Sequence, residues 1–478
     1  MAQSLTSVKV LEDRLHRSPR RITLSEAAAL TGLSVRDAEH ALRDLLVRYE
    51  CRLQVTENGD LIYDFGETLN RRGEKTTAEQ LEEVLDWLWN AFTVAYKTGI
   101  AVTLVVYCII FAVLLIGLML REGGKRHGSA GIQALVRIFA AIFEWSAHSR
   151  IKHEQTRKRE ADGKPKKEFI PSVYDFVFGP PREEPDPLAN LRKVSAYLRQ
   201  NKGVVVTSEL KALLGMESQE AAAFLAECVA RFQGDLNVSD TGVMYAQFDQ
   251  ILRTINPADT TSPQFCWETE EAPYELTGNS PGYNWLIGGM NAFNLVMSFA
   301  LMVGLVVAIP PVGILLGWVP HVFSALFFVI PAVRSVFVRQ AEQQRQFTAA
   351  RNRVMRVIFE QGGAPMLAEE MVRAVNIDRR QSPLSFEKVT EILEHLVKEL
   401  PGERQFPGDG RILYAFPAIQ LELNAIAQVR QSLSRDDSLG QVVFDSNVEP
   451  TLEPALEPEK QMGQSVKTAP NVRRKEQL

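Results

Sequence analysis

Residues 98–120 form an apolar run of 23 residues without a charged side chain. An α-helix rises about 1.5 Å per residue, so roughly 20 apolar residues cross the hydrocarbon core of a bilayer. A buried helix of a soluble domain is the alternative, but such helices rarely stay uncharged over this length. The run also lies too far from the N-terminus to be a signal peptide. The sequence therefore predicts a transmembrane helix over 98–120.

A second apolar block, 285–333, is divided by the adjacent residues Pro310 and Pro311. Two prolines remove two backbone hydrogen-bond donors and interrupt a helix at that point. Each part of the block is long enough to cross a bilayer. The block therefore predicts a helical hairpin with transmembrane helices over 285–309 and 312–333.

The predicted spans contain one ionisable side chain, His321, directly after Pro320. We expect Pro320 to kink its helix and His321 to hydrogen-bond a carbonyl that the proline leaves without a partner. A proton relay is the alternative role of His321. Three spans with one ionisable residue provide little polar pathway, so a transporter or channel is disfavoured unless the chain forms a homo-oligomer.

Charged residues beside the spans predict their orientation. Residues 334–356 contain six arginines and one acid, and residues 121–167 contain twelve Lys or Arg against five Asp or Glu. Both segments are expected on the cytoplasmic side. The second segment is also expected to bind anionic lipid headgroups at the membrane surface. Its candidate lipid-binding residues are Arg150, Lys152, Arg157, Lys158, Arg159, Lys164, Lys166 and Lys167.

Three stretches outside the apolar runs resemble one another. Each has a helix–turn–helix pattern and ends in a short β-ribbon, which reads LQVTENGDLIYDF from 53, LNVSDTGVMYAQF from 236 and RQFPGDGRILYAF from 404. In every ribbon a glycine precedes a phenylalanine by six residues, which predicts a hairpin turn with positive φ and aromatic side chains facing a core. A helix–turn–helix followed by a two-stranded wing is typical of a winged-helix unit. The ribbon residues are Gly59, Tyr63, Phe65, Gly242, Phe248, Gly410, Tyr414 and Phe416.

These features predict an α+β membrane protein with three winged-helix-like units and about three transmembrane helices, one of them a single span and two in a Pro-Pro hairpin. The segments follow in chain order. They are unit 1 over 1–75, an amphipathic connector over 76–97, the first span over 98–120, a basic interfacial segment over 121–170, unit 2 over 171–255, an acidic linker over 256–284, the second and third spans over 285–309 and 312–333, unit 3 over 334–433 and a disordered tail over 434–478.

The segment 172–181 (SVYDFVFGPP), at the start of unit 2, has aromatic side chains at alternate positions, followed by two prolines. Alternation is typical of a strand, so we expect a docking strand for a partner protein. The alternative is a segment that covers the core of unit 2. The candidate partner-docking residues are Tyr174, Phe176 and Phe178.

No catalytic constellation is recognisable in the sequence. The four cysteines are far apart and form no CxxC pair, and neither a phosphate-binding loop nor an HExxH or GxSxG motif is present. We therefore expect no enzyme activity, no catalytic residues, no cofactor and no metal. The cysteines are Cys51, Cys108, Cys228 and Cys266.

Charge decides between DNA and protein as the partner of the units. A DNA-binding unit needs a basic second helix and wing, because it neutralises phosphates. The chain has a net charge of −5, and the second helix of unit 1 balances Arg36, Arg43 and Arg48 with three acids. The second helices of units 2 and 3 have more acids than bases. We therefore expect a non-enzymatic scaffold or assembly factor that binds other proteins, with nucleic acid disfavoured; the alternative is a membrane-tethered DNA-binding transcriptional regulator.

Three segments carry a resemblance to known proteins: 59–65 (GDLIYDF), 172–187 (SVYDFVFGPPREEPDP) and 201–215 (NKGVVVTSELKALLG). Through these segments, and the apolar hairpin that follows them, the chain resembles a poorly characterised family of membrane proteins from cyanobacteria and plastids. The resemblance implies this architecture and no particular chemistry. Some relatives carry an iron–sulfur biosynthesis label, which the isolated cysteines of this chain do not support.

The N-terminal residues lack the Ser- and Arg-rich, acid-poor composition of a transit peptide, so we expect a bacterial inner membrane with units 2 and 3 in the cytoplasm. Two alternatives stay open for unit 1. Acids before the first span and bases after it predict an N-terminus outside the cytoplasm. Three similar units are instead expected in one compartment, which requires the region 98–145 to enter the membrane and return.

Overall fold

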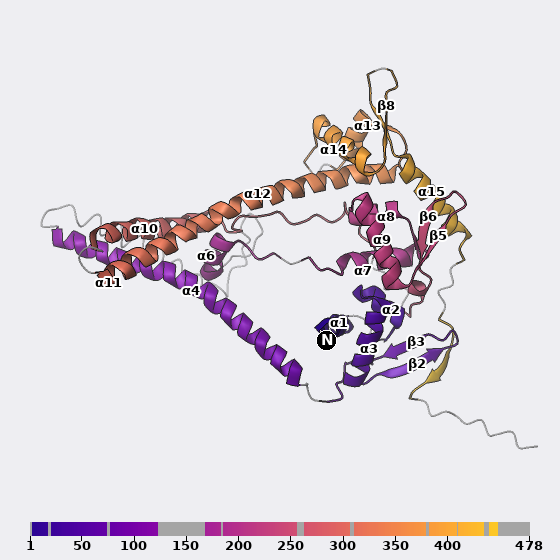
Figure 1. Ribbon diagram of the computed structural model, residues 1–478, viewed down its shortest axis with the longest axis horizontal. Coiled ribbons are helices and arrows are strands. Elements are labelled where there is room, and N and C mark those ends of the chain that lie inside the picture. The colour runs from indigo at the N-terminus through magenta and orange to yellow at the C-terminus, as the bar shows by residue number, and fades with distance from the viewer. Residues whose placement is uncertain are drawn as a thin grey trace, which may run out of the picture.

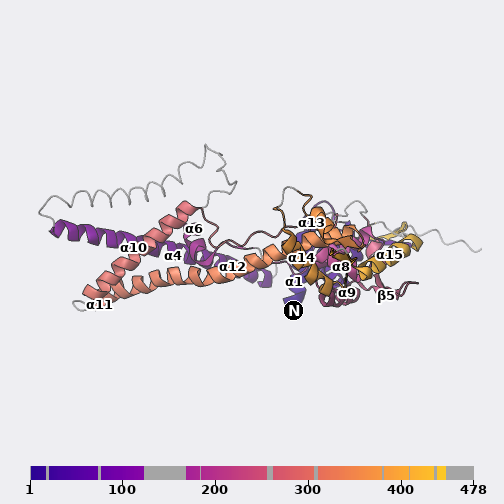
Figure 2. The same cartoon turned by 90° about the horizontal axis from the view of Figure 1, so that it is seen from above.

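The computed structural model describes two parts of the molecule (Figure 1). Long helices converge at one end, and three small units stand in a column at the other end. The view from above in Figure 2 shows the same separation. The described residues are 2–17, 21–73, 77–122, 168–182, 185–255, 262–305, 310–378, 382–408, 410–434 and 439–447.

Within the described residues, three helices are long and apolar enough to cross a membrane. The first contains both the predicted connector and the predicted first span, because residues 77–122 include no proline that would interrupt it. Its first half exposes large apolar side chains, with Trp87 66% and Trp89 69% exposed. The apolar surface of this helix therefore begins well before residue 98. The three helices are α4 (Thr77–Glu122), α10 (Pro281–Leu305) and α12 (Val319–Glu360).

The second and third long helices form the predicted hairpin, in which α10 packs against α12. A short helix, α11 (Pro310–Gly313), begins at the proline pair and continues as a π-helical turn, η2 (Ile314–Trp318), directly before α12. A π-turn relieves the backbone where Pro320 cannot donate a hydrogen bond. At Gly317 an added Cβ would lie 3.1 Å from the Met302 Cα, so the missing side chain lets the two arms approach closely.

Two buried amides on one face of α10 connect the three long helices. Asn291 Nδ2 donates to the Ser324 carbonyl of α12 at 2.9 Å, and Asn294 Nδ2 donates to the Leu104 carbonyl of α4 at 2.9 Å. Both asparagines are fully buried. In an apolar environment such interhelical hydrogen bonds hold helices together where the hydrophobic effect between them is weak. The three helices therefore form one bundle.

The helix α12 has 42 residues and does not end at the predicted boundary of the third span. It continues into the column of units, where Val354 and Ile358 belong to the core of unit 3. The arginines along it contact the protein itself: Arg345 pairs with Glu342 at 2.8 Å and donates to the Glu271 carbonyl at 3.0 Å. Hydrogen bonds, chiefly from Arg345, lower the pKa of Glu342 to about 2. The predicted acidic linker is thereby held along α12.

Unit 1 begins with a helix and a short strand, followed by two helices and a hairpin. Thr23 caps the first of these two helices and forms a capping box with Glu26, while Gly32 ends it with φ +78°. Ser34 caps the next helix by accepting a hydrogen bond from the Asp37 amide. The elements are α1 (Ala2–Leu15), β1 (Arg21–Thr23), α2 (Leu24–Thr31), α3 (Val35–Arg48), β2 (Arg52–Thr56) and β3 (Leu61–Asp64).

Unit 2 repeats this order of elements, with Gly215 at φ +74° ending the first helix of the pair. Its core is a separate cluster in which Leu198, Leu210, Cys228 and Phe248 are fully buried. The elements are α7 (Ala189–Gln200), β4 (Val204–Val205), α8 (Thr207–Leu214), α9 (Ser218–Phe232), β5 (Asp235–Val238) and β6 (Met244–Gln247), with a 3-10 turn η1 (Gln250–Leu252) after them.

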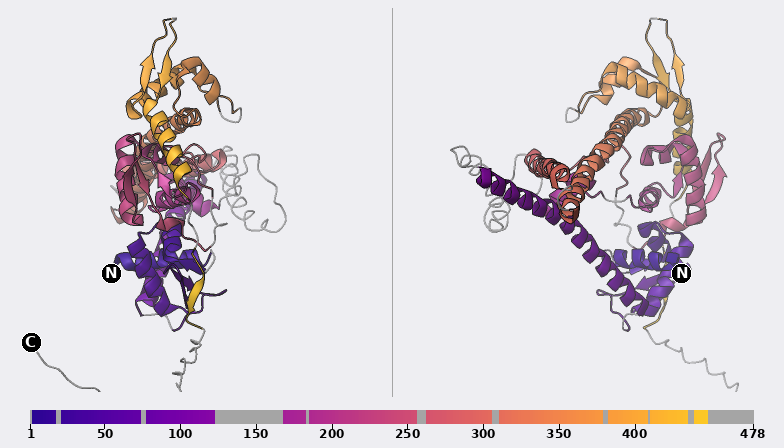
Figure 3. Two further views of the ribbon diagram at one scale, coloured as in Figure 1. Left: turned by 90° about the vertical axis from the view of Figure 1, so that its right-hand side faces the viewer. Right: turned by 60° about the vertical axis from the view of Figure 1, so that its left-hand side comes forward.

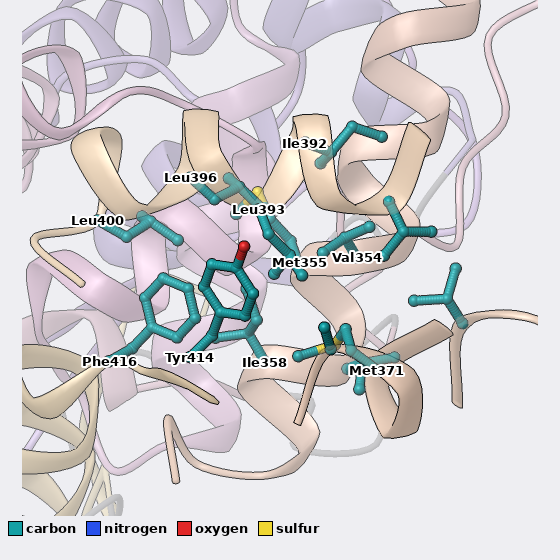
Figure 4. Packing of buried hydrophobic residues seen from close by; sticks show 14 of the residues in the cluster. Val354, Met355, Ile358, Met371, Ile392, Leu393, Leu396, Leu400, Tyr414 and Phe416 are labelled. Carbon is teal, nitrogen blue, oxygen red and sulfur yellow. The ribbon is translucent and has the colours of Figure 1, made fainter. Parts of the chain in front are cut away.

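Unit 3 uses the end of α12 as its first helix. Figure 4 shows Ile358 of α12 and Leu396 of α14 (Phe386–Glu399) lying against Tyr414 and Phe416 of the hairpin. All four side chains are at most 2% exposed. The remaining elements are β7 (Met366–Leu367), α13 (Ala368–Val375), α14 (Phe386–Glu399), β8 (Glu403–Gln405) and β9 (Leu413–Ala415).

The three sheets share one strand order, in which the last strand of the unit lies between the first and the second: β1-β3-β2, β4-β6-β5 and β7-β9-β8. All neighbouring strands are antiparallel. The register is also shared, because the residue before the ribbon phenylalanine pairs with the first residue of the second strand in each unit. These pairs are Arg52 with Asp64, Asp235 with Gln247, and Glu403 with Ala415.

The chain after unit 3 is ordered over two further elements. The helix α15 (Pro417–Ser432) leaves unit 3 and lies against α8 and β4 of unit 2. The strand β10 (Val442–Asp445) then joins the sheet of unit 1 as a fourth strand beside β2. Figure 3 shows this yellow strand beside the indigo unit. The predicted disordered tail over 434–478 is therefore wrong for these strand residues, because pairing with the edge of the unit 1 sheet orders them.

Candidate interaction surfaces

Each unit ends in an antiparallel hairpin; we call these ribbon 1 (β2–β3), ribbon 2 (β5–β6) and ribbon 3 (β8–β9). The turn glycines Gly59, Gly242 and Gly410 have φ of +80°, +79° and +77°, a conformation that side chains with a Cβ rarely adopt. The aromatic residues of the sequence motif lie inside the unit cores. At most 5% of each side chain is exposed for Tyr63, Phe65, Phe248, Tyr414 and Phe416.

The outer edge of ribbon 1 is covered by β10. The Glu57 amide donates to the Gln441 carbonyl at 2.9 Å, and the Ser446 amide donates to the Leu53 carbonyl at 2.9 Å. A sheet edge presents unpaired amides and carbonyls and readily pairs with another strand. In unit 1 this pairing is made by the chain's own C-terminal strand.

One carboxylate fixes the position of β10. Asp445 Oδ1 accepts a hydrogen bond from Arg52 Nε at 2.6 Å, and a second guanidinium nitrogen of Arg52 contacts Oδ2. Gln54 Nε2 also donates to Oδ2 at 2.8 Å. These hydrogen bonds, chiefly those from Arg52, lower the pKa of Asp445 below its usual range. The strand is therefore recognised by charge as well as by its backbone.

The outer edge of ribbon 2 carries no strand among the described residues, because β5 is the last strand of its sheet. Its apolar side chains face solvent: Leu236 is 51% exposed, Val238 66% and Met244 59%. An exposed apolar strand edge is a predicted site of pairing with another chain. The edge strand of ribbon 3, β8, also has no neighbour among the described residues, but its residues Glu403–Gln405 are polar, so ribbon 2 presents the more apolar of the two open edges.

The charge at the ribbon 2 edge is reversed relative to ribbon 1. The shared register aligns Asp235 with Arg52, and Asn237 with Gln54. Asp235 is exposed. A strand equivalent to β10 would therefore meet a carboxylate in unit 2 where Asp445 meets a guanidinium in unit 1.

In each unit, the second helix of the helix–turn–helix pair contacts a neighbouring unit. The α3 helix of unit 1 contacts α9 of unit 2. At the start of α9, the Ser218 hydroxyl donates to the Glu399 carbonyl at the end of α14. Arg351 of α12 pairs with the buried Glu399 carboxylate and donates to the Gly215 carbonyl at 3.1 Å. The helices that would enter a DNA groove are thus engaged in contacts between units.

The helix α15 is held on unit 2 by a partly buried bidentate ion pair. Arg430 Nη1 lies 2.6 Å from Glu209 Oε1, and Nη2 lies 2.8 Å from Oε2. The side chains are 19% and 6% exposed. Ala425 and Ile426 of α15 pack against Val204 of unit 2. This contact connects units 2 and 3 and brings the chain toward ribbon 1.

The predicted docking strand at 172–181 is wrong, because Tyr174, Phe176 and Phe178 lie on the helix α6 (Phe169–Phe178). Apolar side chains at helical spacing face the long helices, which outweighs the alternation of the aromatic residues. Phe176 stacks on Phe327 of α12 at 5.5 Å, and Tyr174 contacts Tyr96 of α4 at 6.4 Å. These aromatic residues therefore cover the helical bundle, and the alternative, that they cover the core of unit 2, is wrong as well.

His321 lies on α12 and faces α10. Its Nδ1 is 3.3 Å from the Ser298 hydroxyl, and its ring lies 5.8 Å from that of Phe299. The hydrogen bond is thus made to a hydroxyl across the hairpin, and the predicted bond to a carbonyl freed by Pro320 is wrong in its partner. The π-turn before Pro320 already rearranges the local backbone hydrogen bonds.

The four cysteines form no disulfide, and Cys228 and Cys266 are buried. Among the described residues, no three His, Cys, Asp or Glu side chains gather where they could hold a metal ion. Burial raises the pKa of the Cys228 thiol to about 12 and those of Cys51 and Cys266 to about 11. These thiols are therefore protonated at neutral pH. The candidate lipid-binding residues Arg150 to Lys167 lie outside the described residues.

A comparison with known proteins finds one distant relative. An uncharacterised chloroplastic protein of Arabidopsis thaliana is 23% identical to this chain over 368 residues, which cover 70% of this chain and 68% of the plant protein. No protein-family model matches the chain, and no solved structure matches it. The similarity indicates a distant relationship to a plastid-type protein.

Proposed function

We propose that the chain is an integral membrane protein whose three winged-helix-like units act together as a scaffold that binds other proteins. The observation that carries this proposal is the open apolar edge of ribbon 2, with Leu236, Val238 and Met244 exposed. The order of helices and strands in each unit supports the winged-helix assignment. The three long apolar helices support a membrane anchor.

Contacts between units 1 and 2 support a single compartment for both. The Ser195 hydroxyl donates to the Ala29 carbonyl at 2.6 Å, and the Thr254 hydroxyl donates to Glu26 Oε1 at 2.8 Å. Surfaces in direct contact lie on the same side of a bilayer, so the chain from α4 to α6 would cross the membrane an even number of times. The excess of basic residues over 121–167 favours the cytoplasmic side of an inner membrane and binding to anionic headgroups.

The proposed partner is a protein that adds an extended strand to β5. Ribbon 1 provides the precedent, because β10 occupies the equivalent edge in unit 1. Main-chain hydrogen bonds supply affinity in such strand addition, and side-chain contacts supply specificity. Because Asp235 stands where ribbon 1 has Arg52, the partner strand would carry Lys or Arg where β10 carries Asp445.

The alternative of a membrane-tethered DNA-binding regulator is less well supported. Its reading helices would be α3, α9 and α14, whose contacts with neighbouring units leave less surface for a duplex. Arg43, one of the three arginines on α3, pairs with Glu39 at 2.5 Å. A paired guanidinium contributes less to phosphate binding.

Site-specific photocrosslinking in native membranes tests the scaffold proposal. A photoreactive side chain at Val238 is expected to capture a defined protein, while the same group at Asp240, on the ribbon turn, captures it much less. Leu236→Lys combined with Met244→Lys is expected to abolish the crosslink without changing the amount of protein in the membrane. Both residues are exposed, so their replacement leaves the core intact.

Nuclease treatment separates the two functions. A protein partner that persists after nuclease digestion supports the scaffold. Recovery of defined DNA segments that disappear in the Arg36→Ala, Arg43→Ala variant, together with no protein crosslink at Val238, would replace the scaffold with the regulator. High salt would weaken such DNA binding steeply, whereas it would change an apolar protein interface little.

A further inference from the structure

A cavity of about 320 Å³ lies where unit 1 meets unit 2. Its walls come from α1 and α2 of unit 1, from α7 of unit 2 and from residues 262–264 after unit 2. Junctions between domains are common places for small-molecule sites, and such sites typically measure about 300–1,000 Å³. The cavity therefore has the position and the smaller size of a ligand site.

Four of the residues that line the cavity are cationic, and none is acidic. Arg192 pairs with Asp186, whose Oδ2 lies 2.5 Å from Nη2. Arg199 is only 5% exposed. The four cationic residues are Arg14, Arg192, Lys193 and Arg199.

Arg14 adds a second, independent observation. Its Nε is buried and makes no hydrogen bond within the part of the chain that the structure describes. A buried donor without a partner costs free energy, and like charges around one cavity repel each other. An anion in the cavity would offset both costs, because guanidinium and ammonium groups form charge-assisted hydrogen bonds with oxyanions.

We propose that this cavity binds a small, water-soluble anion that carries a phosphate group. Several cations around one cavity match the charge of a phosphate better than that of a single carboxylate. The helices that line the cavity, α1, α2 and α7, stand in the column of units, away from the end where the long helices converge (Figure 1), so a phospholipid that stays in its bilayer does not reach it. The Ser262 hydroxyl and the Gln264 amide provide neutral donors for the same ligand.

The bound anion would connect two units. Arg14 belongs to unit 1, whereas Lys193 and Arg199 belong to unit 2. A ligand that contacts both units only when they are packed together stabilises that arrangement by mass action. The site would therefore couple the level of a soluble phosphate compound to the arrangement of units 1 and 2. This inference does not depend on the scaffold function.

Calorimetric titration of the full-length protein in lipid nanodiscs with pyrophosphate tests the proposal. Wild type is expected to bind pyrophosphate, with an affinity that falls as salt concentration rises. Lys193→Gln and Arg14→Gln are each expected to weaken binding by about tenfold, because each removes a charge-assisted hydrogen bond. Arg36→Gln, which removes the same charge from an exposed position on α3, is the matched control and is expected to change the affinity less than about twofold.

Two further readouts make the outcome decisive. Pyrophosphate is expected to raise the melting temperature of wild type and of Arg36→Gln, but not that of the two cavity variants. Lys193 is only half-buried, so Lys193→Gln carries the test if Arg14→Gln fails to fold. Absence of pyrophosphate binding by wild type at low salt, or an equal loss in Arg36→Gln, would overturn the proposal. Displacement of bound pyrophosphate by phosphatidic acid vesicles would show that a lipid headgroup reaches the site.

Discussion

Ribbons 1 and 2 have the same strand order, the same turn geometry and a buried phenylalanine at the equivalent position, yet their outer edges differ. The edge of ribbon 1 pairs with β10 and holds Asp445 through Arg52. The edge of ribbon 2 is bare among the described residues and exposes apolar side chains. A repeated unit can thus keep one backbone while a few exposed residues assign its edge to an internal strand or leave it open to a partner.

The two edges also differ in how they are connected to the rest of the chain. The helix α15 docks on unit 2 through Arg430, and β10, further along the chain, pairs with ribbon 1. We therefore expect the covered edge in unit 1 to depend on the contact made in unit 2. Three variants test the comparison. The first removes the Arg430 contact, the second removes Asp445, and the third reverses the charge at Asp235.

Arg430→Ala is expected to have the largest effect. Removal of one partner from a buried ion pair leaves Glu209 without its cation and costs about 3–5 kcal/mol. We expect α15 to leave unit 2 and β10 to leave ribbon 1, so amide hydrogen exchange should speed up over both β10 and β2. Arg231→Ala, which removes an exposed pairing with Glu227, is the control. Unchanged hydrogen exchange over β2 in Arg430→Ala would show that β10 covers ribbon 1 whether or not α15 is docked on unit 2.

Asp445→Ala is expected to have a smaller and more local effect. We expect β10 to leave ribbon 1 while α15 stays docked on unit 2. Because its folded pKa lies below the unfolded value of about 3.9, Asp445 contributes stability above that pH and loses it as the pH falls through the lowered pKa. Phe444→Trp, at a position 53% exposed, provides a fluorescent reporter of strand release. Emission should stay constant between pH 8 and pH 5 and shift only in stronger acid, whereas Asp445→Ala should show the released signal throughout. A release midpoint near neutral pH would contradict the role of Asp445.

Asp235→Arg is expected to have the smallest effect, because it adds one exposed ion pair. It gives ribbon 2 the cation that ribbon 1 uses, so a labelled peptide with the sequence of residues 441–447 should bind the variant more tightly than wild type. Exposed pairs contribute about 0.2–1 kcal/mol, which corresponds to a gain of up to about fivefold. Fluorescence anisotropy measures it, and a peptide with Asn in place of Asp445 should lose the gain. Equal binding of both peptides would show that charge does not select the strand at this edge.

The sequence predicted the repeated elements well where local rules decide them. The ribbon glycines Gly59, Gly242 and Gly410 have the positive φ that the repeated motif predicts, and a pair of helices precedes the hairpin in each unit. These features depend on neighbours within a few residues, so they are readable from one sequence. The long apolar helices are readable for the same reason, because their composition alone requires burial or a membrane.

The surfaces were much less predictable. The aromatic residues of α6 were misread as a strand, since both alternation and helical spacing fit a ten-residue apolar segment. The exposure of Leu236 and Val238 has no sequence signal, because alternating apolar residues equally suit a buried strand. The basic cavity draws Arg14 from α1 and Lys193 from α7, which only the packing of two units brings together.

By itself, the sequence determined the number of repeated units, their turns and caps, and the apolar helices, because each follows from interactions between residues close along the chain. Tertiary structure decided that β10 covers ribbon 1, that ribbon 2 stays open and that unit 1 packs on unit 2. These outcomes join residues far apart along the chain: Arg52 and Asp445 are separated by 393 positions, and Ser195 and Ala29 by 166. Such pairings depend on shape and charge across whole units, which no local pattern records.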